Sequence, residues 1–202
     1  MMQIQNELDF IIAVDALKNV ERRNFNADDQ RRENTAEHSW QIIIFAQILY
    51  PYAQQKEQID LLRVIRMLSI HDLVEIGVGD TFIFDDKGME GKFERERQAA
   101  EALFGSLNND TGKLFLELWL EFEERATPDS VFANAIDRLI PFVLNSHTTG
   151  KSWREALVNE TQVRKRLQEA ISEAGGAFEE VFTTLLAKNI DDGKIVAANV
   201  LN

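Results

Sequence analysis

The feature that most constrains the fold is a helical spacing of apolar residues along nearly the whole chain, in which helix-breaking residues are scarce. The 202 residues include 10 glycines and 3 prolines, and no apolar–polar alternation is long enough to predict a useful strand. Apolar side chains instead recur three and four positions apart, as they do on one face of a helix. The sequence therefore predicts an all-α, helical bundle-like fold, organised as a single domain over residues 1–202.

Local signals place the ends of these helices. Asn34 is followed three residues later by Glu37, which resembles a capping box, and Thr127 precedes Pro128 at a first helical position. We expect loops at 26–34 and 80–91. The expected helices cover residues 8–20, 34–51, 59–76, 90–107, 111–126, 127–145, 152–173 and 177–190.

Composition excludes several classes of protein. The chain has 22 basic and 34 acidic residues, so its net charge of −12 argues against binding a nucleic acid polymer. Cysteine is absent, which excludes disulfides, thiolate zinc sites and cysteine nucleophiles. The N-terminal segment has no basic region, and the apolar runs are far shorter than the roughly 20 residues of a membrane span. We expect a cytoplasmic protein that does not enter a membrane.

Ionisable residues cluster in the stretch LSIHDLVEIGVGD, positions 68–80. His71 and Glu75 are four residues apart and share a helix face that is otherwise apolar. A buried acid without a partner is costly, whereas imidazole and carboxylate groups together suit a divalent metal. The alternative is that His71 only caps the helix C-terminus, because a His–Asp pair alone is weak evidence for a metal.

Two further residues could complete such a site. His38, in RRENTAEHSWQ, precedes an apolar helix and is expected to face the interior, where it could also be an ordinary core histidine. Asp137 lies mid-helix among apolar neighbours in FANAIDRLIPF, and Pro141 four residues later should bend the helix there. Asp137 could hold a ligand, or it could simply pair with Arg138.

The order H…HD…D resembles the signature of the HD-domain metal-dependent phosphohydrolases. Longer blocks extend the likeness: RRENTAEHSWQ, RMLSIHDLVEIGVGDTF, ELWLEFEERATPDSVFANAIDRLIP and LNSHTTGKSW are similar to the branch that contains the bacterial 5′-deoxynucleotidases. The resemblance implies a single HD domain, with a metal-binding core at about 17–145 and C-terminal helices at about 152–190. It also implies one divalent metal, held by His38, His71, Asp72 and Asp137.

The same resemblance implies catalytic roles for two acids. Glu75, one turn beyond His71, matches the glutamate that accepts a proton from the attacking water. Asp80 matches an acid that acts in catalysis or substrate binding. The glycines at 77 and 79 would let the chain turn and bring Asp80 back towards the metal.

Arginines are the expected phosphate ligands, because a guanidinium binds phosphate oxygens bidentately. Arg22 stands where this branch carries its phosphate-binding arginine. Arg23 stands where the branch tends to have an aromatic residue on the sugar, a departure that bears on selectivity for 2′-deoxy substrates. Arg31 and Arg32 are second candidates for substrate binding.

Other polar and aromatic residues have simpler interpretations. Two-metal members of the superfamily that this chain resembles use several additional histidines, and the chain has three in all, so the resemblance implies a single-metal site. His147 is interpreted as a helix cap or surface residue. Trp40 and Trp153 could stack on a base, but core packing is the preferred interpretation. Nitrogen and oxygen ligands accept Mn, Fe, Co, Ni or Zn, so the sequence leaves the metal open.

These observations predict an enzyme that hydrolyses a small phosphorylated substrate. The preferred function is a metal-dependent nucleotidase that removes the 5′-phosphate from (deoxy)nucleoside monophosphates. The alternatives are hydrolysis of another small phosphoester or of a pyrophosphate-bearing nucleotide, or a non-catalytic metal- or nucleotide-binding HD module. Large apolar residues at 114, 118, 119 and 122 also suggest a homodimer if part of that helix is exposed.

Overall fold

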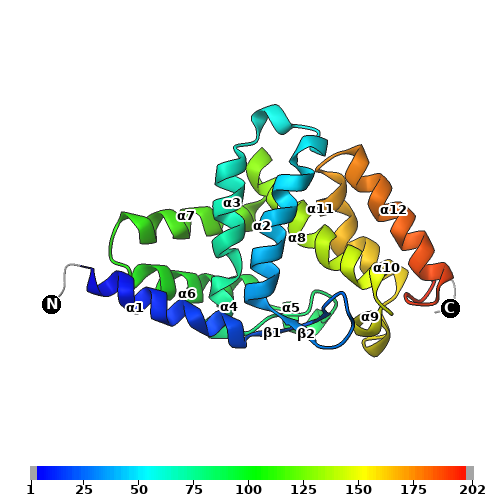
Figure 1. Cartoon of the computed structure of the whole chain (residues 1–202), viewed down its shortest axis with the longest axis horizontal. Coiled ribbons are helices and arrows are strands. Elements are labelled where there is room, and N and C mark those ends of the chain that lie inside the picture. The colour runs from blue at the N-terminus through cyan, green and yellow to red at the C-terminus, as the bar shows by residue number, and fades with distance from the viewer. Residues whose placement is uncertain (1–3, 199–202) are drawn as a thin grey trace.

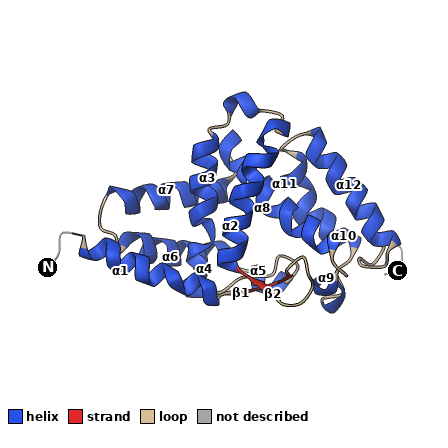
Figure 2. Ribbon diagram, viewed as in Figure 1, coloured by secondary structure: helices blue, strands red, loops and turns tan. Residues whose placement is uncertain are grey.

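The computed structural model describes residues 4–198. Helices make up nearly all of the regular structure (Figure 2), so the predicted all-α class is confirmed. The longer helices are α1 (Gln5–Val14), α2 (Thr35–Leu49), α3 (Leu61–Ile70), α6 (Lys92–Gly105), α7 (Asp110–Glu124), α8 (Pro128–His147) and α12 (Gly176–Asp191). The short ones are α4 (Glu75–Val78), α5 (Asp86–Met89), α9 (Lys151–Glu155), α10 (Glu160–Val163) and α11 (Glu169–Ser172).

Capping side chains explain where the central helices begin. The Asn34 side chain accepts a hydrogen bond from the Glu37 backbone N–H at 3.0 Å, and the Glu37 carboxylate accepts one from the Asn34 N–H at 3.2 Å. This is a complete capping box at the start of α2. Thr127 caps α8 in the same manner, with Pro128 in the first turn.

Helix α8 is the centre of the molecule. It packs against α2 and α3 on one side and against α11 and α12 on the other, while α7 crosses it near its start (Figure 1). One cluster of buried apolar side chains extends from Phe10 to Ile195. Helix α8 continues through Pro141 to His147. Asp137, which the sequence placed in mid-helix, therefore lies within one continuous helix.

A two-stranded hairpin was not predicted. β1 (Glu21–Phe25) pairs antiparallel with β2 (Arg32–Asn34), with Glu21 opposite Asn34 and Phe25 opposite Arg32. The expected loop at 26–34 is therefore wrong for its last three residues, because strands this short carry no readable alternation. The hairpin lies beneath α2 in the view of Figure 1, and β2 contacts that helix.

Two predicted helices are interrupted. The helix expected at 59–76 changes to a 3₁₀ turn at His71–Val74 before α4 begins. The helix expected at 152–173 breaks between α9 and α10, since Leu157 adopts φ +52° and Asn159 caps a new helix. Sequence periodicity continues across both breaks, so it could not reveal them.

The apolar residues of α7 are mostly internal. Leu118, Trp119 and Phe122 are buried, so they do not form the exposed face that the homodimer hypothesis needed there. Among residues 4–198, no helix combines the length and the apolar character needed to cross a bilayer.

Candidate metal centre

Three buried side chains from three different elements meet above the hairpin. His38 lies in the first turns of α2, His71 opens the 3₁₀ turn after α3, and Asp137 lies midway along α8. One ligand atom from each lies within 4.8 Å of the other two. Two nitrogens and a carboxylate oxygen at this separation suit one divalent ion.

Hydrogen bonds orient the two imidazoles. His71 Nδ1 lies 3.1 Å from the Leu68 carbonyl oxygen and can only donate to it, which leaves the lone pair on Nε2. This Nε2 atom is buried and makes no well-aligned hydrogen bond among the described residues, although carboxylate oxygens of Asp72 and Asp137 lie 3.1 and 3.5 Å from it. His38 Nε2 lies 2.9 Å from Asp137 Oδ1. A buried imidazole whose outer nitrogen is anchored and whose inner nitrogen is unpaired fits a metal ligand.

Asp72 extends the cluster towards the pocket. Its Oδ1 lies 3.1 Å from His71 Nε2, and its Oδ2 lies 3.7 Å from His38 Nε2. Arg138 approaches the other carboxylate, with Nη1 3.4 Å from Asp137 Oδ2. Although burial alone would raise it, Arg138 and the hydrogen bond from His38 hold the pKa of Asp137 well below its usual value.

Glu75 begins α4 and is buried beside the cluster. Its Oε2 accepts a hydrogen bond from Thr35 Oγ1 at 2.8 Å. Burial and the neighbouring charge of Asp72 raise the pKa of Glu75 well above its usual value. A raised pKa favours the protonated carboxyl group. Positive charge placed near Glu75 would lower this pKa again, so that the ionised carboxylate could act as a base at neutral pH.

Arg22, on β1, brings a fixed positive charge to the same place. Gly79 ends α4 with φ +79° and turns the chain, so that Asp80 Oδ1 lies 3.4 Å from Arg22 Nη1. The same nitrogen lies 3.3 Å from Asp72 Oδ2. Burial acts against the charged guanidinium, but the acids around it, Asp80 first, raise the pKa of Arg22 further. The guanidinium therefore stays charged inside the protein.

The centre carries an excess of buried negative charge. Five carboxylates face two arginines, Arg22 and Arg138, in the site. The five are Glu33, Asp72, Glu75, Asp80 and Asp137. Burial raises the pKa values of Glu33, Glu75 and Asp80. A divalent cation would offset this excess, which is a second reason why these residues fit a metal.

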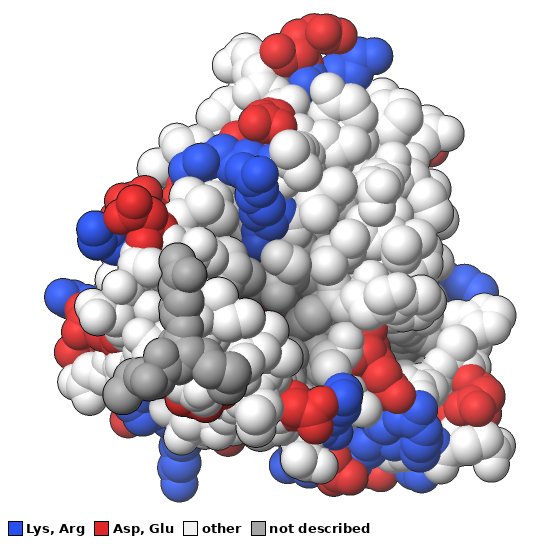
Figure 3. Space-filling model, turned by 60° about the vertical axis from the view of Figure 1, so that its left-hand side comes forward, with Lys and Arg blue, Asp and Glu red and all other residues white. Residues whose placement is uncertain are grey.

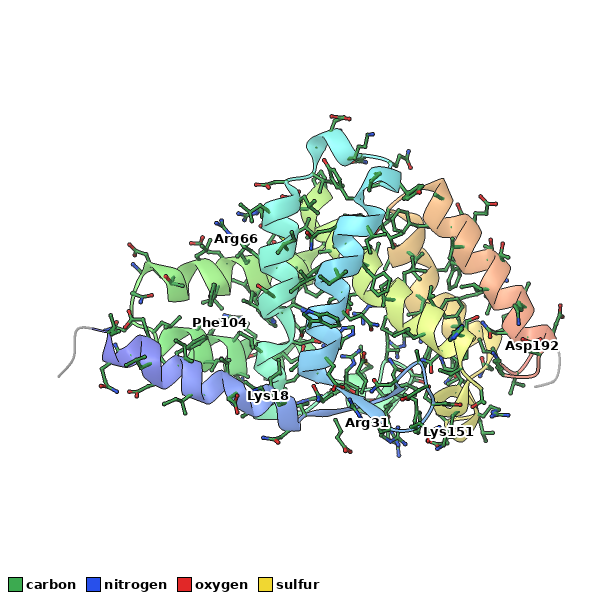
Figure 4. The ribbon with its side chains drawn as sticks, viewed as in Figure 1. Lys18, Arg31, Arg66, Phe104, Lys151 and Asp192 are labelled. Carbon is green, nitrogen blue, oxygen red and sulfur yellow. The ribbon has the colours of Figure 1, made fainter. Side chains whose placement is uncertain are left out.

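A pocket opens over the centre and contains most of the predicted substrate residues. Arg22, Arg23 and Asp80 line it, together with Lys92 from α6. Arg31 does not line the pocket: its guanidinium pairs with Glu37 at 2.6 Å on the outer side of the hairpin (Figure 4). The structure thus brings Arg22 and Arg23 to the site and leaves Arg31 outside it.

The remaining candidates are also placed. Trp153 is buried and packs on Phe142 with ring centroids 5.3 Å apart, as core packing predicts, and it also lines the pocket. Core packing is wrong for Trp40, whose side chain is 67% exposed. Helix α2 is apolar all round, so part of that surface must face outward. His147 is exposed at the end of α8, as expected. Arg32 pairs with Glu155 at 2.9 Å.

Sequence reasoning missed several residues of the site. Glu33 is buried behind His38, Thr35 holds Glu75, and Lys92 forms an ion pair with the buried Glu96 in the pocket wall. Glu33 and Thr35 flank the capping residue Asn34. The available signal was the capping box beside the candidate ligand His38. Residues next to the cap lie close to the buried start of the helix, so Glu33 and Thr35 could have been expected near the site.

The model of the HD domain family matches residues 14–179. The chain belongs to the HD domain family. A protein from Magnetospirillum magnetotacticum MS-1, solved as a crystal structure and described as a predicted metal-dependent phosphohydrolase, superposes with a TM-score of 0.86. It is 39% identical, and the alignment covers 94% of this chain and 96% of that chain.

Curated relatives give a second comparison. The 5′-deoxynucleotidase HDDC2 of Homo sapiens is 28% identical over 132 residues, which is 65% of this HD domain chain and 62% of the relative. The protein of the same name from Dictyostelium discoideum is 25% identical over 139 residues, or 67% of this chain and 73% of the relative. The chain thus matches less than two thirds of the human relative's own length.

Proposed function

We propose that this HD domain protein is a metal-dependent phosphohydrolase, and specifically a nucleotidase that removes the 5′-phosphate from (deoxy)nucleoside monophosphates. The observation that carries the proposal is the meeting of His38, His71 and Asp137 beside the largely buried Arg22, where Arg22, His71 and Asp137 line one pocket. The names of the curated relatives support the nucleotide substrate.

The metal ligands in this proposal are His38, His71, Asp72 and Asp137. A divalent ion there would polarise a phosphate oxygen and lower the pKa of a bound water. The donor set of two imidazoles and two carboxylates accepts Mn, Fe, Co, Ni or Zn, so availability contributes to which ion is bound.

The other residues act on substrate and water. Arg22 donates hydrogen bonds to the phosphate oxygens, and its buried charge stabilises the negative charge of the transition state. Glu75 accepts a proton from the attacking water, while Thr35 holds one of its oxygens at 2.8 Å. Glu75 then returns this proton to the 5′-oxygen of the departing nucleoside, which leaves as a hydroxyl group. Asp80 holds Arg22 in place from the side of the loop.

The sugar preference is a separate part of the proposal. Arg23 is exposed and lines the pocket, in the position where the related branch tends to have an aromatic residue. A guanidinium there can donate a hydrogen bond to a sugar hydroxyl, whereas the face of an aromatic ring packed on the sugar cannot. We therefore expect ribonucleoside monophosphates to be hydrolysed as well as their deoxy counterparts.

The test is phosphate release from ribo- and deoxyribonucleoside 5′-monophosphates. The protein is stripped of metal and reloaded with Mn²⁺, Co²⁺ or Zn²⁺, and Glu75→Gln is compared with Glu37→Gln. Glu37 is a matched control, because it lies on the outside and glutamine can also complete a capping box. We expect metal-dependent release that Glu75→Gln lowers by at least about 100-fold, within the range of general-base effects.

Release that survives in Glu75→Gln would refute the assigned base. A bound metal without release from any monophosphate would refute the nucleotidase. It would favour another phosphoester, a pyrophosphate-bearing nucleotide or a binding module.

We also propose a cytoplasmic, single-domain homodimer. Trp40, Ile44 and Ile48 recur every four residues along α2 and are exposed. In a two-fold dimer the same stripe meets itself, so a second copy of this chain is the partner that fits it. Trp40→Glu should yield a monomer in sedimentation velocity, and an unchanged sedimentation coefficient would contradict this face. On the face drawn in Figure 3, lysines and arginines lie beside acids. Together with the net charge of −12, this does not favour a nucleic acid polymer as partner.

A further inference from the structure

Glu33 is a buried acid to which the proposed chemistry gives no role. It lies on β2, one residue before the cap of α2, and is 3% exposed. Burying a carboxylate is costly unless its charge and its lone pairs are used. The hairpin turns this side chain inward, between the first metal ligand and the phosphate arginine.

The carboxylate of Glu33 faces both of these residues through one oxygen. Glu33 Oε2 lies 3.2 Å from Arg22 Nε and 3.8 Å from His38 Nδ1. All three atoms are buried, and none has a hydrogen-bond partner among the described residues. Buried polar atoms without partners are rare. Two nitrogens that face one carboxylate oxygen indicate that Glu33 accepts hydrogen bonds from them after a small change in the site.

The change concerns which ring nitrogen of His38 carries the proton. In the structure, His38 Nε2 lies 2.9 Å from Asp137 Oδ1, so a proton between them sits on Nε2. An imidazole that binds a metal through Nε2 carries its proton on Nδ1 instead. The acceptor that Nδ1–H then faces is Glu33. No bond to carbon forms or breaks; the proton only changes nitrogen as the metal takes the lone pair.

We propose that Glu33 is a positioning residue that orients His38 towards the metal and Arg22 towards the phosphate. The part concerning the phosphate rests on the proposed function, whereas the part concerning His38 needs only that a divalent metal binds. One carboxylate that holds both groups would couple them. Loss of its charge should weaken metal binding and raise KM for the substrate, while Glu75 and Thr35 keep their contact.

The experiment compares Glu33→Gln with Glu37→Gln in the full chain. Co²⁺ affinity is measured by titration of metal-stripped protein, and circular dichroism shows that each variant is folded. Partners that orient metal-binding histidines contribute about 10–100-fold in affinity, so we expect a loss of this size in Glu33→Gln and no more than about 2-fold in Glu37→Gln. With saturating metal, KM should rise more than kcat falls.

A measurement on the unsubstituted protein keeps the inference testable if Glu33→Gln does not fold. In ¹⁵N-labelled, Zn²⁺-loaded protein, the His38 ring should carry its proton on Nδ1, and in the metal-free protein on Nε2. A His38 proton on Nε2 in the Zn²⁺-loaded protein would overturn the inference. So would a Co²⁺ affinity of Glu33→Gln equal to that of the unsubstituted protein.

The outcomes separate this inference from the proposed function. If the unsubstituted protein binds no divalent metal, both are overturned. If it binds metal and Glu33→Gln binds it equally well, only the role of Glu33 is overturned. If metal binding depends on Glu33 but no phosphoester is hydrolysed, the positioning of His38 stands and the nucleotidase does not.

Discussion

Arg22→Met is the substitution that most directly tests the electrostatics of the site. It keeps a side chain of similar length but removes the positive charge that lies within 3.2–3.4 Å of Glu33, Asp72 and Asp80. The Arg22 side chain is 12% exposed, so solvent screens these interactions little. The variant leaves three acids close together without their shared cation.

The expected loss follows from the burial. Removing one partner from a buried ion pair costs about 3–5 kcal/mol, because the remaining charge is left uncompensated. In a domain of this size, each kcal/mol lowers Tm by about 2–4 °C. We therefore expect the metal-free Arg22→Met protein to unfold about 6–20 °C below the unsubstituted protein.

The loss should depend on pH in a defined direction. Burial already raises the pKa values of Glu33 and Asp80, and removal of Arg22 raises them further. The folded variant then binds more protons than its unfolded chain, so its free energy of unfolding falls as pH rises above the ordinary carboxyl pKa values. The difference from the unsubstituted protein should be larger near about pH 8 than near about pH 5.5.

Thermal unfolding of chelator-treated protein, followed by circular dichroism, measures both effects. Arg31→Met is the matched control, since the Arg31 side chain is 58% exposed and a surface substitution changes stability by about 0.5 kcal/mol or less. Adding Zn²⁺ should restore part of the lost stability. A metal-free Arg22→Met protein that unfolds within about 2 °C of the unsubstituted protein near pH 8 would refute the reasoning.

Three further predictions concern stability. Asn34→Ala removes the acceptor of the Glu37 N–H and should lower the free energy of unfolding by about 1 kcal/mol in urea titrations. In Gly112→Ala, the added Cβ would lie 2.3 Å from the Phe104 carbonyl oxygen, so the α6–α7 contact must open; a loss of about 1–3 kcal/mol is expected, and an unchanged urea midpoint would contradict it. Removal of a divalent ion present at 100 times its Kd should cost about 2.7 kcal/mol, measured by calorimetry with and without chelator.

The sequence by itself determined what is local. Helical spacing gave the all-α class, and the capping box of Asn34 and Glu37 and the proline after Thr127 marked two helix starts within a residue. These features depend on side chains three or four positions apart. The His71–Asp72 pair and His38 could also be recognised locally as candidate metal ligands. Apolar neighbours on the same stretch of helix indicate that such a polar side chain is buried.

The tertiary structure alone decided how distant segments meet. Packing of α2, α3 and α8 brings His38, His71 and Asp137 within 4.8 Å, and the hairpin places Glu33 behind His38 and Arg22. The hairpin is too short to carry alternation, so a buried acid on it looked like part of a polar loop. The resemblance favoured Arg22 over Arg31 as the phosphate ligand, but the local sequence does not show which of the two side chains is buried. The fold of the hairpin decides this, with 12% of the Arg22 side chain and 58% of the Arg31 side chain exposed. Periodicity encodes which face of an element is buried, whereas the distance between two buried faces depends on how all the elements pack at once.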